Sequence, residues 1–183
     1  MLNPREVIED LPSFCRARVV ILGVGNVLFG DDGFGPAVIE ELERRYQIPA
    51  DVYLMDVGTG VRKLLFTLTL SAVRPADVVI VDAVDWGRQV GQVFNLPVEQ
   101  LPISKIDDFS LHQVPTSNLL RELQDACGVR VTVVACDVGA IPQRIQPGLS
   151  APVSQAVLVA GRAIAQQFSF NPSLTEVWAP ARK

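Results

Sequence analysis

Histidine and cysteine are scarce in this sequence of 183 residues, which contains one histidine and three cysteines. A single histidine excludes the H-E-x-x-H motif of zinc peptidases, because that motif needs two. The cysteines, Cys15, Cys127 and Cys136, are odd in number and form no C-x-x-C pair, so neither a disulfide framework nor a thiolate zinc site is expected. We predict reduced, packed thiols in a cytoplasmic protein.

Excess positive charge and long apolar runs are also missing. A net charge of −4 and a pI near 5.0 leave no basic surface for a phosphate backbone, so no nucleic-acid partner is predicted. No apolar run approaches the roughly 18 residues needed to cross a bilayer, and the first ten residues lack an apolar signal core. We therefore expect neither a membrane span nor secretion.

The overall composition is that of a folded globular protein. Hydrophobic residues make up 49% and charged residues 20% of the chain, which excludes wholesale disorder. The length suits one domain better than two. We expect a single domain over residues 1–183, with a core of about 18–168 and a C-terminal tail at 169–183.

Short apolar runs alternate with helical patterns along the chain. Runs rich in valine and isoleucine predict strands at residues 19–22, 52–55, 78–81, 92–96 and 131–136. Amphipathic patterns predict helices ending near Tyr46, ending before Gly128, and spanning about 151–168 with Ser150 as the cap. This order predicts an α/β three-layer sandwich, with a central, mostly parallel five-stranded sheet and helices on both faces.

Acidic and amide residues follow the predicted strands. In an open parallel sheet, ligands bind beyond the carboxyl ends of the strands. Those ends carry Asn26, Asp31, Asp32, Asp56, Asp82, Asp85 and Asp137. Carboxylates that face one crevice repel one another unless a cation offsets them. For Asp31, a role in a cap or turn explains the residue at least as well as a role in binding.

The one histidine, His112, follows a long connection at residues 97–111. A lone histidine more often makes a structural hydrogen bond than it binds a metal. However, two aspartates and one imidazole would form a mixed oxygen and nitrogen site that suits a first-row divalent ion. Such a site would leave coordination positions open.

The glycine-rich stretch GVGNVLFGDD fails two nucleotide-binding patterns. Leu28 stands where a dinucleotide fingerprint needs its third glycine, and Asp31 and Asp32 stand where a phosphate loop needs Lys and Ser/Thr. Two carboxylates would repel a phosphate. The residues around Ser150 lack the second glycine of a nucleophile elbow. The glycines are then expected to allow a tight turn and close backbone approach.

Five longer stretches occur in order: VVILGVGNVLFGDDGFGPAVIEEL, LMDVGTG, VVIVDAVDWG, SLHQVP and VTVVACDVG. Together they resemble the hydrogenase maturation endopeptidase family, over about residues 18–168. Within that family, the motif sequences GNVLFGDDGFGP and FSLHQVPTSNLL are most similar to the branch that processes deazaflavin-reducing or related cytoplasmic hydrogenases.

The resemblance implies an aspartyl-type endopeptidase with a metal-binding and catalytic trio at Asp32, Asp82 and His112. Some family members carry glutamate at the place of Asp32, so the side chain here is one methylene shorter. The implied activity is removal of a short C-terminal extension from a nickel-iron hydrogenase large-subunit precursor after nickel insertion. The nickel would belong to the substrate, and we expect no tightly bound cofactor in the protease itself.

Two alternatives remain open at the level of the sequence. A nucleotide-binding α/β oxidoreductase or transferase would use the same topology, but would need phosphate recognition at residues 23–30. A noncatalytic nickel-binding assembly module would keep the trio and lack proteolysis. The metal-site prediction itself requires that the Asp32, Asp82 and His112 side chains converge on one point.

Overall fold

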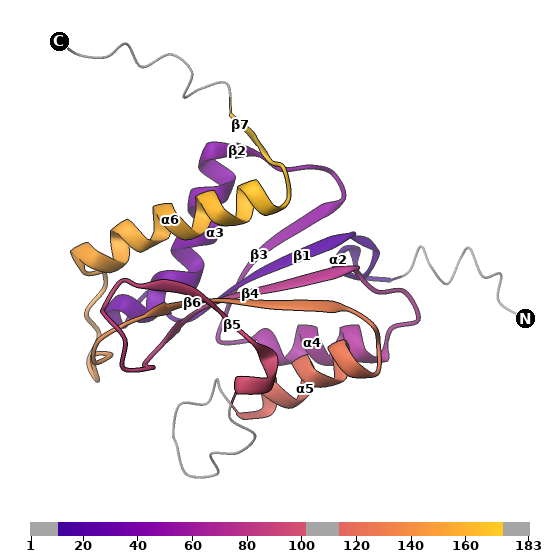
Figure 1. The fold of residues 1–183 in the computed structure, drawn as a ribbon, viewed down its shortest axis with the longest axis horizontal. Helices are drawn as coiled ribbons and strands as arrows, with labels where there is room; N and C mark the ends of the chain where they lie inside the picture. Colours follow the sequence, from indigo (N-terminus) through magenta and orange to yellow (C-terminus); the bar gives the residue numbers. More distant parts are fainter. Residues whose placement is uncertain (1–10, 102–113, 174–183) are drawn as a thin grey trace, which may run out of the picture.

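A five-stranded sheet forms the centre of the molecule (Figure 1). The computed structural model describes residues 11–101 and 114–173. The sheet has the strand order β3-β1-β4-β6-β5; the first four strands are parallel, and β5 runs antiparallel to β6 at the edge. Its strands are β1 (Val19–Val24), β3 (Val52–Gly58), β4 (Asp77–Val84), β5 (Val93–Leu96) and β6 (Arg130–Asp137).

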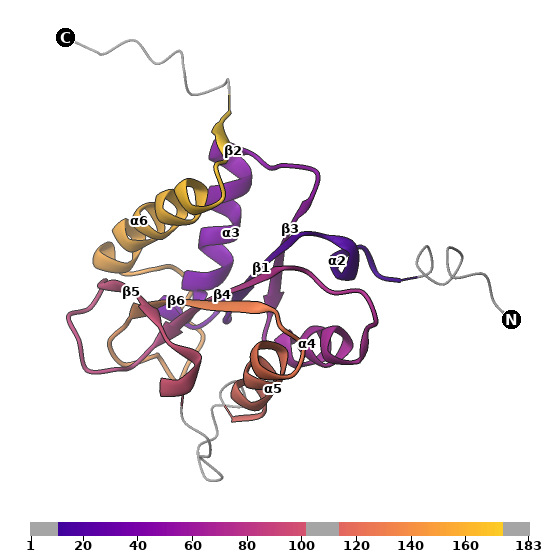
Figure 2. The same ribbon diagram turned by 45° about the vertical axis from the view of Figure 1, so that its right-hand side comes forward.

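Helices cover both faces of this sheet (Figure 2). On one face lie α3 (Phe34–Arg45) and α6 (Ala151–Gln167); on the other lie α2 (Ser13–Arg16), α4 (Val61–Leu70) and α5 (Val114–Asp125). Along β1, Val19 and Ile21 pack into the first core and Val20 and Leu22 into the second. Residues of β1 therefore have no exposed side, which explains their continuous apolar run.

The predicted fold class is confirmed. Each predicted strand coincides with an observed strand. Four of them are one to three residues longer at an end than predicted, and the strand predicted at 92–96 begins one residue later, at Val93. Two details differ from the prediction. The sequence pattern predicts Tyr46 on a helical face, but α3 ends at Arg45. Tyr46 begins the short strand β2 (Tyr46–Gln47), which pairs with β7 (Asn171–Pro172). Helix α4 was not predicted.

The first turn of α3 sits directly on the carboxyl ends of β1 and β4. A Cβ atom on Gly35 would lie 2.2 Å from the Val24 carbonyl oxygen and 2.4 Å from that of Val81. A Cβ atom on Gly23 would lie 2.5 Å from the Gly35 carbonyl oxygen. Only glycine allows this approach. The close packing fixes the segment before α3 against the edge where ligands of such sheets bind.

Candidate active site

The glycine loop, residues 25–33, turns from β1 into α3 and ends in the short 3-10 helix η1 (Gly30–Gly33). Gly25 has a φ of +132°, and a Cβ atom there would lie 1.9 Å from the Asp32 carbonyl oxygen. The Asp32 carboxylate accepts a hydrogen bond of 2.7 Å from the backbone amide of Asn26. The end of the loop is thus folded back onto its start, and this contact sets the position of the Asp32 side chain.

Asp82 lies on β4 just beyond its pairing with β1, which ends at the pair Gly23 and Val81. The side chain is partly accessible to solvent. Burial holds the pKa of the Asp82 carboxyl well above its usual range, the charge of Asp32 raises this pKa further, and a hydrogen bond involving the Ala83 backbone opposes the shift. The structure therefore brings Asp32 and Asp82, two of the three predicted ligands, within electrostatic reach of each other.

The third predicted ligand, His112, lies outside the described residues. Among residues 11–101 and 114–173, no group of three His, Cys, Asp or Glu side chains is arranged to hold a metal ion. The described part of the site is therefore a pair of carboxylates. Such a pair suits an oxygen-preferring cation, because a cation would offset the repulsion that raises the pKa of Asp82.

Asp31 makes a hydrogen bond that connects two segments of the fold. Its carboxylate accepts a hydrogen bond of 2.6 Å from the amide of Ser150, which joins the glycine loop to the start of α6 across 119 residues. Ser150 occupies the predicted N-cap position, but its side chain makes no capping hydrogen bond, so the predicted capping role of that side chain is wrong. Asp31 thus has a structural contact, but this contact is neither the cap nor the local turn suggested by the sequence, because its partner lies 119 residues away.

Asp137 is the most deeply buried of the acids at the strand ends, with 1% of its surface exposed. Its carboxylate accepts hydrogen bonds from the Trp86 amide at 3.1 Å and the Arg88 amide at 3.0 Å. These bonds close the connection between β4 and β5. Asp137 is therefore a structural residue, whereas Asp85, which precedes Trp86, is exposed.

Replacing Asp137 by alanine is expected to lower the free energy of unfolding by about 2 to 4 kcal/mol, because two amides lose a charged acceptor. Urea denaturation followed by circular dichroism measures the change. Asp85→Ala, on the same connection and exposed, should shift the free energy by less than about 0.5 kcal/mol. Equal effects of the two substitutions would show that the Asp137 hydrogen bonds contribute nothing.

The cysteines are free, as predicted, and Cys15 and Cys136 are buried. Burial, with the charges of Asp31 and Asp137, raises the pKa of the Cys136 thiol to about 12. A thiol with so high a pKa supplies almost no thiolate at neutral pH and is a poor nucleophile. Cys136 is therefore a buried packing residue and not a candidate nucleophile.

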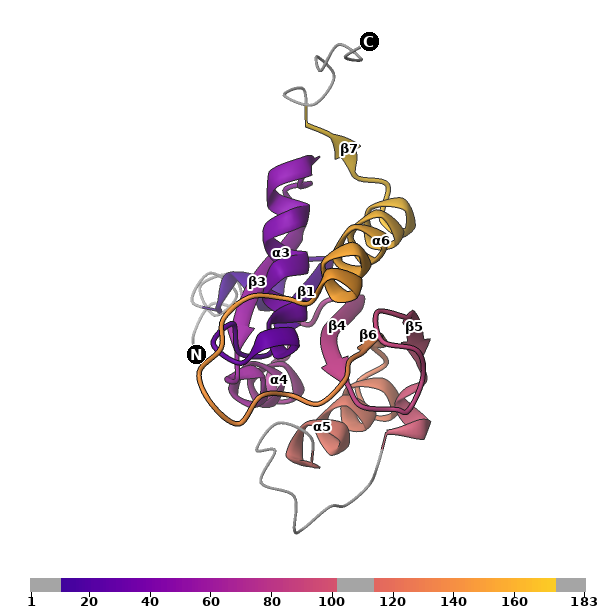
Figure 3. The same ribbon diagram turned by 90° about the vertical axis from the view of Figure 1, so that its left-hand side faces the viewer.

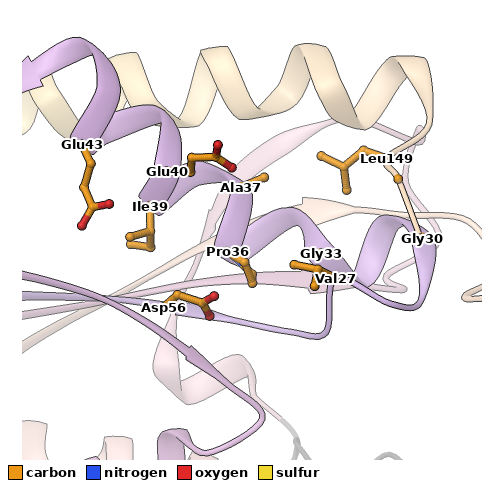
Figure 4. A pocket seen from close by; sticks show the side chains of 11 residues that line it. Val27, Gly30, Gly33, Pro36, Ala37, Ile39, Glu40, Glu43, Asp56 and Leu149 are labelled. Atoms are coloured by element: carbon orange, nitrogen blue, oxygen red, sulfur yellow. The ribbon is translucent and has the colours of Figure 1, made fainter. Parts of the chain in front are cut away.

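A cavity of about 370 Å³ adjoins the glycine loop (Figure 4). Its apolar lining includes Val27, Pro36, Ile39 and Leu149, and three carboxylates, those of Glu40, Glu43 and Asp56, also line it. Asp56 additionally accepts a hydrogen bond of 2.8 Å from the Gly58 amide. Neither Asp32 nor Asp82 lines this cavity, so it is a neighbour of the carboxylate pair.

Comparison with known proteins decides between the functions left open by the sequence. The model of a family described as hydrogenase maturation protease matches residues 36–167. The chain belongs to this family. The protease is accordingly a peptidase that processes the C-terminus of a hydrogenase large subunit, and the oxidoreductase, transferase and noncatalytic alternatives are set aside.

Individual relatives agree with the assignment. The protease is 35% identical to a putative hydrogenase maturation protease of Methanocaldococcus jannaschii, over 78% of this chain and 90% of that protein. It is 31% identical to the coenzyme F420 hydrogenase subunit delta of Methanothermobacter thermautotrophicus, over 77% of this chain and 88% of the relative. Among solved structures, the hydrogenase maturating endopeptidase HybD from E. coli superimposes with a TM-score of 0.65 at 26% identity, covering 85% of this chain and 96% of HybD.

No helix within the described residues of the protease combines the length and the apolar character needed to span a membrane.

Proposed function

We propose that the protease recognises nickel already inserted into the hydrogenase large-subunit precursor, and that Asp32, Asp82 and His112 bind this nickel. The observation that carries the proposal is that Asp32 and Asp82 both lie at the carboxyl edge of the sheet, in an electrostatic coupling that adds to burial in raising the pKa of Asp82. Such coupling is unfavourable without a cation and favourable with one.

Substrate-borne nickel suits such a site. A nickel ion held by substrate thiolates retains positions for oxygen and nitrogen donors, which aspartate and histidine supply. Docking through the ion makes cleavage conditional on nickel insertion, because a precursor without nickel lacks the group that the carboxylates bind. The site then distinguishes nickel-loaded from nickel-free precursor.

Asp82 also has the properties of a general base. A carboxylate must be ionised to act as a base; burial and the charge of Asp32 raise the pKa of Asp82, and the positive charge of docked nickel would lower it again. Once the precursor is docked, the Asp82 carboxylate would take a proton from the water that attacks the scissile carbonyl. Docking comes first in this scheme, and the chemistry depends on it.

The deciding experiment compares nickel-loaded with nickel-free large-subunit precursor, with the product weighed by mass spectrometry. The wild-type protease should release the C-terminal extension only from the nickel-loaded form. The triple variant Asp32→Ala, Asp82→Ala, His112→Ala should release it from neither, while keeping its circular dichroism spectrum. Complete cleavage by the triple variant, or equal cleavage of both precursors by the wild type, would contradict the proposal.

Because the site would be completed only by the substrate, we expect the isolated protease to keep no tightly bound metal. Dialysis against a weak chelator, followed by elemental analysis, should leave less than about 0.1 nickel or zinc ion per chain. Stoichiometric metal that survives dialysis would indicate a resident cofactor. That outcome would make nickel recognition in the substrate unnecessary.

We further propose that the substrate belongs to the deazaflavin-reducing hydrogenases or their close relatives. The sequence of the glycine loop supports assignment to this branch of the family, and so does the similarity to a protein named as a coenzyme F420 hydrogenase subunit. Precursors from several hydrogenase classes, each loaded with nickel, can be compared in one assay. Faster processing of a precursor from another class would place the protease elsewhere in the family.

A further inference from the structure

Four exposed apolar side chains lie on the glycine loop and on the segment that pairs with it. They come from the glycine loop and from the segment between β6 and α6, and form what we call the apolar rim: Val27, Leu28, Ile141 and Ile145, exposed by 53%, 44%, 42% and 69%. Leaving large apolar side chains in water is unfavourable. Several of them on two paired segments at a functional edge are typical of a surface that binds a partner.

The two segments of the apolar rim are joined by backbone contacts. The Gly30 amide donates to the Gln146 carbonyl and the Gln146 amide donates to the Leu28 carbonyl, both at 2.9 Å. Phe29 and Gln146 form an isolated parallel β-bridge. Leu28 and Ile145, which each precede a bridge residue, therefore lie at matching positions on the two adjacent segments. A Cβ atom on Gly30 would lie 3.1 Å from the Pro142 ring. Figure 3 shows the segment before α6 running beside the glycine loop.

The apolar rim shares its loop with Asp32 and shares Val27 with the neighbouring cavity. Asp32, whose carboxylate accepts from the Asn26 amide, lies in the same loop as Val27 and Leu28. Val27 also lines the cavity of about 370 Å³, together with Ile39 and Leu149. A polypeptide that places its scissile bond at Asp32 and Asp82 would therefore have apolar surface to contact along its path.

We propose that the apolar rim binds an apolar segment of the large-subunit precursor next to the scissile bond, through contacts that do not depend on nickel. This inference rests on the proposed function, since it assumes that the precursor docks at Asp32 and Asp82. Its occupant is the precursor because the rim adjoins the residues that must meet that protein. The fixed backbone of both segments means that little ordering is needed on binding.

The test uses the double variant Leu28→Ser, Ile145→Ser with nickel-loaded precursor. Loss of two half-exposed aliphatic side chains from the contact should raise KM about tenfold, which is about 1.4 kcal/mol of binding free energy, while kcat stays within about twofold. The matched control is Leu70→Ser, Val159→Ser, at side chains that are 71% and 57% exposed on α4 and α6. The control should leave both constants unchanged.

Measuring the binding of the protease to nickel-free precursor, which is not expected to be cleaved, separates this inference from nickel recognition. With nickel-free precursor, the apolar-rim variant should still bind about tenfold more weakly than the wild type, whereas Asp32→Ala should bind as the wild type does. An unchanged KM in the apolar-rim variant, with Asp32→Ala inactive, would overturn the apolar-rim proposal and leave the proposed function standing. Sedimentation supplies a second check: a wild-type dimer that the apolar-rim substitutions dissociate without change in KM would assign the rim to self-association and also overturn the proposal.

Discussion

Asp82→Asn is expected to abolish processing while making the protease more stable at neutral pH. Asparagine keeps the size of the side chain but can neither act as a base nor carry negative charge to the nickel. The rate of processing should fall by at least about a hundredfold, the usual contribution of a general base. Mass spectrometry of the nickel-loaded precursor over time measures this loss.

The gain in stability follows from the sign of the pKa shift. The pKa of Asp82 is higher in the folded protein than in the unfolded chain, so the folded state holds the proton more tightly. Its contribution to stability is greatest below the unfolded pKa of about 3.9 and is lost as pH rises through the folded pKa. At neutral pH the ionised form of this partly buried carboxyl therefore destabilises the protein.

Urea denaturation at two pH values tests this reasoning. At a pH near 4 the Asp82 carboxyl is largely protonated, and Asp82→Asn should have nearly the stability of the wild type. At pH 7.5 the variant should be the more stable of the two. Asp85→Asn, exposed three residues further along, should change neither stability nor processing. A variant less stable than the wild type at pH 7.5 would mean that the carboxylate is held by favourable contacts.

The strands could be predicted from the sequence because each is covered on at least one face and reads as a short β-branched run. Helix α4 was missed although Val61, Leu65 and Leu68 have helical spacing and are buried. Its exposed residues Phe66 and Leu70 are also large and apolar, so the polar face that marks an amphipathic helix is weak.

The strand-end rule found Asp32 and Asp82 but could not sort them from other acids at the same edge. Asp31 and Asp137 have the same residue type and similar positions in the sequence, yet each accepts hydrogen bonds from amides that are 49 to 119 residues away. Such long-range partners are set by tertiary packing and leave no local signal. The roles of Asp32 and Asp82 in the family resemblance came from motifs, and their proximity came from the structure.

Gly25→Ala is expected to disable the site without touching any functional side chain. At φ +132° an L-residue is strained, and the new Cβ atom would lie 1.9 Å from the Asp32 carbonyl oxygen and 3.1 Å from its carbon. Backbone cannot yield as a flexible side chain does, so either Gly25 or Asp32 must move. We expect a loss of more than about 3 kcal/mol in the free energy of unfolding, since strain and overpacking act together.

A shift of about 1 Å in a positioning group can cost about a hundredfold in rate, so processing should fall at least that far. Gly128→Ala is the matched control, because Gly128 also has a positive φ, +69°, but a Cβ atom there would meet nothing within 4 Å. This control should lose about 1 to 2 kcal/mol from backbone strain alone and process the precursor normally. If the two alanine variants prove equally stable and equally active, the close approach of Asp32 to Gly25 does not position the carboxylate. The position of the Asp32 carboxylate would then depend on its side-chain contacts, which include the hydrogen bond from the Asn26 backbone amide.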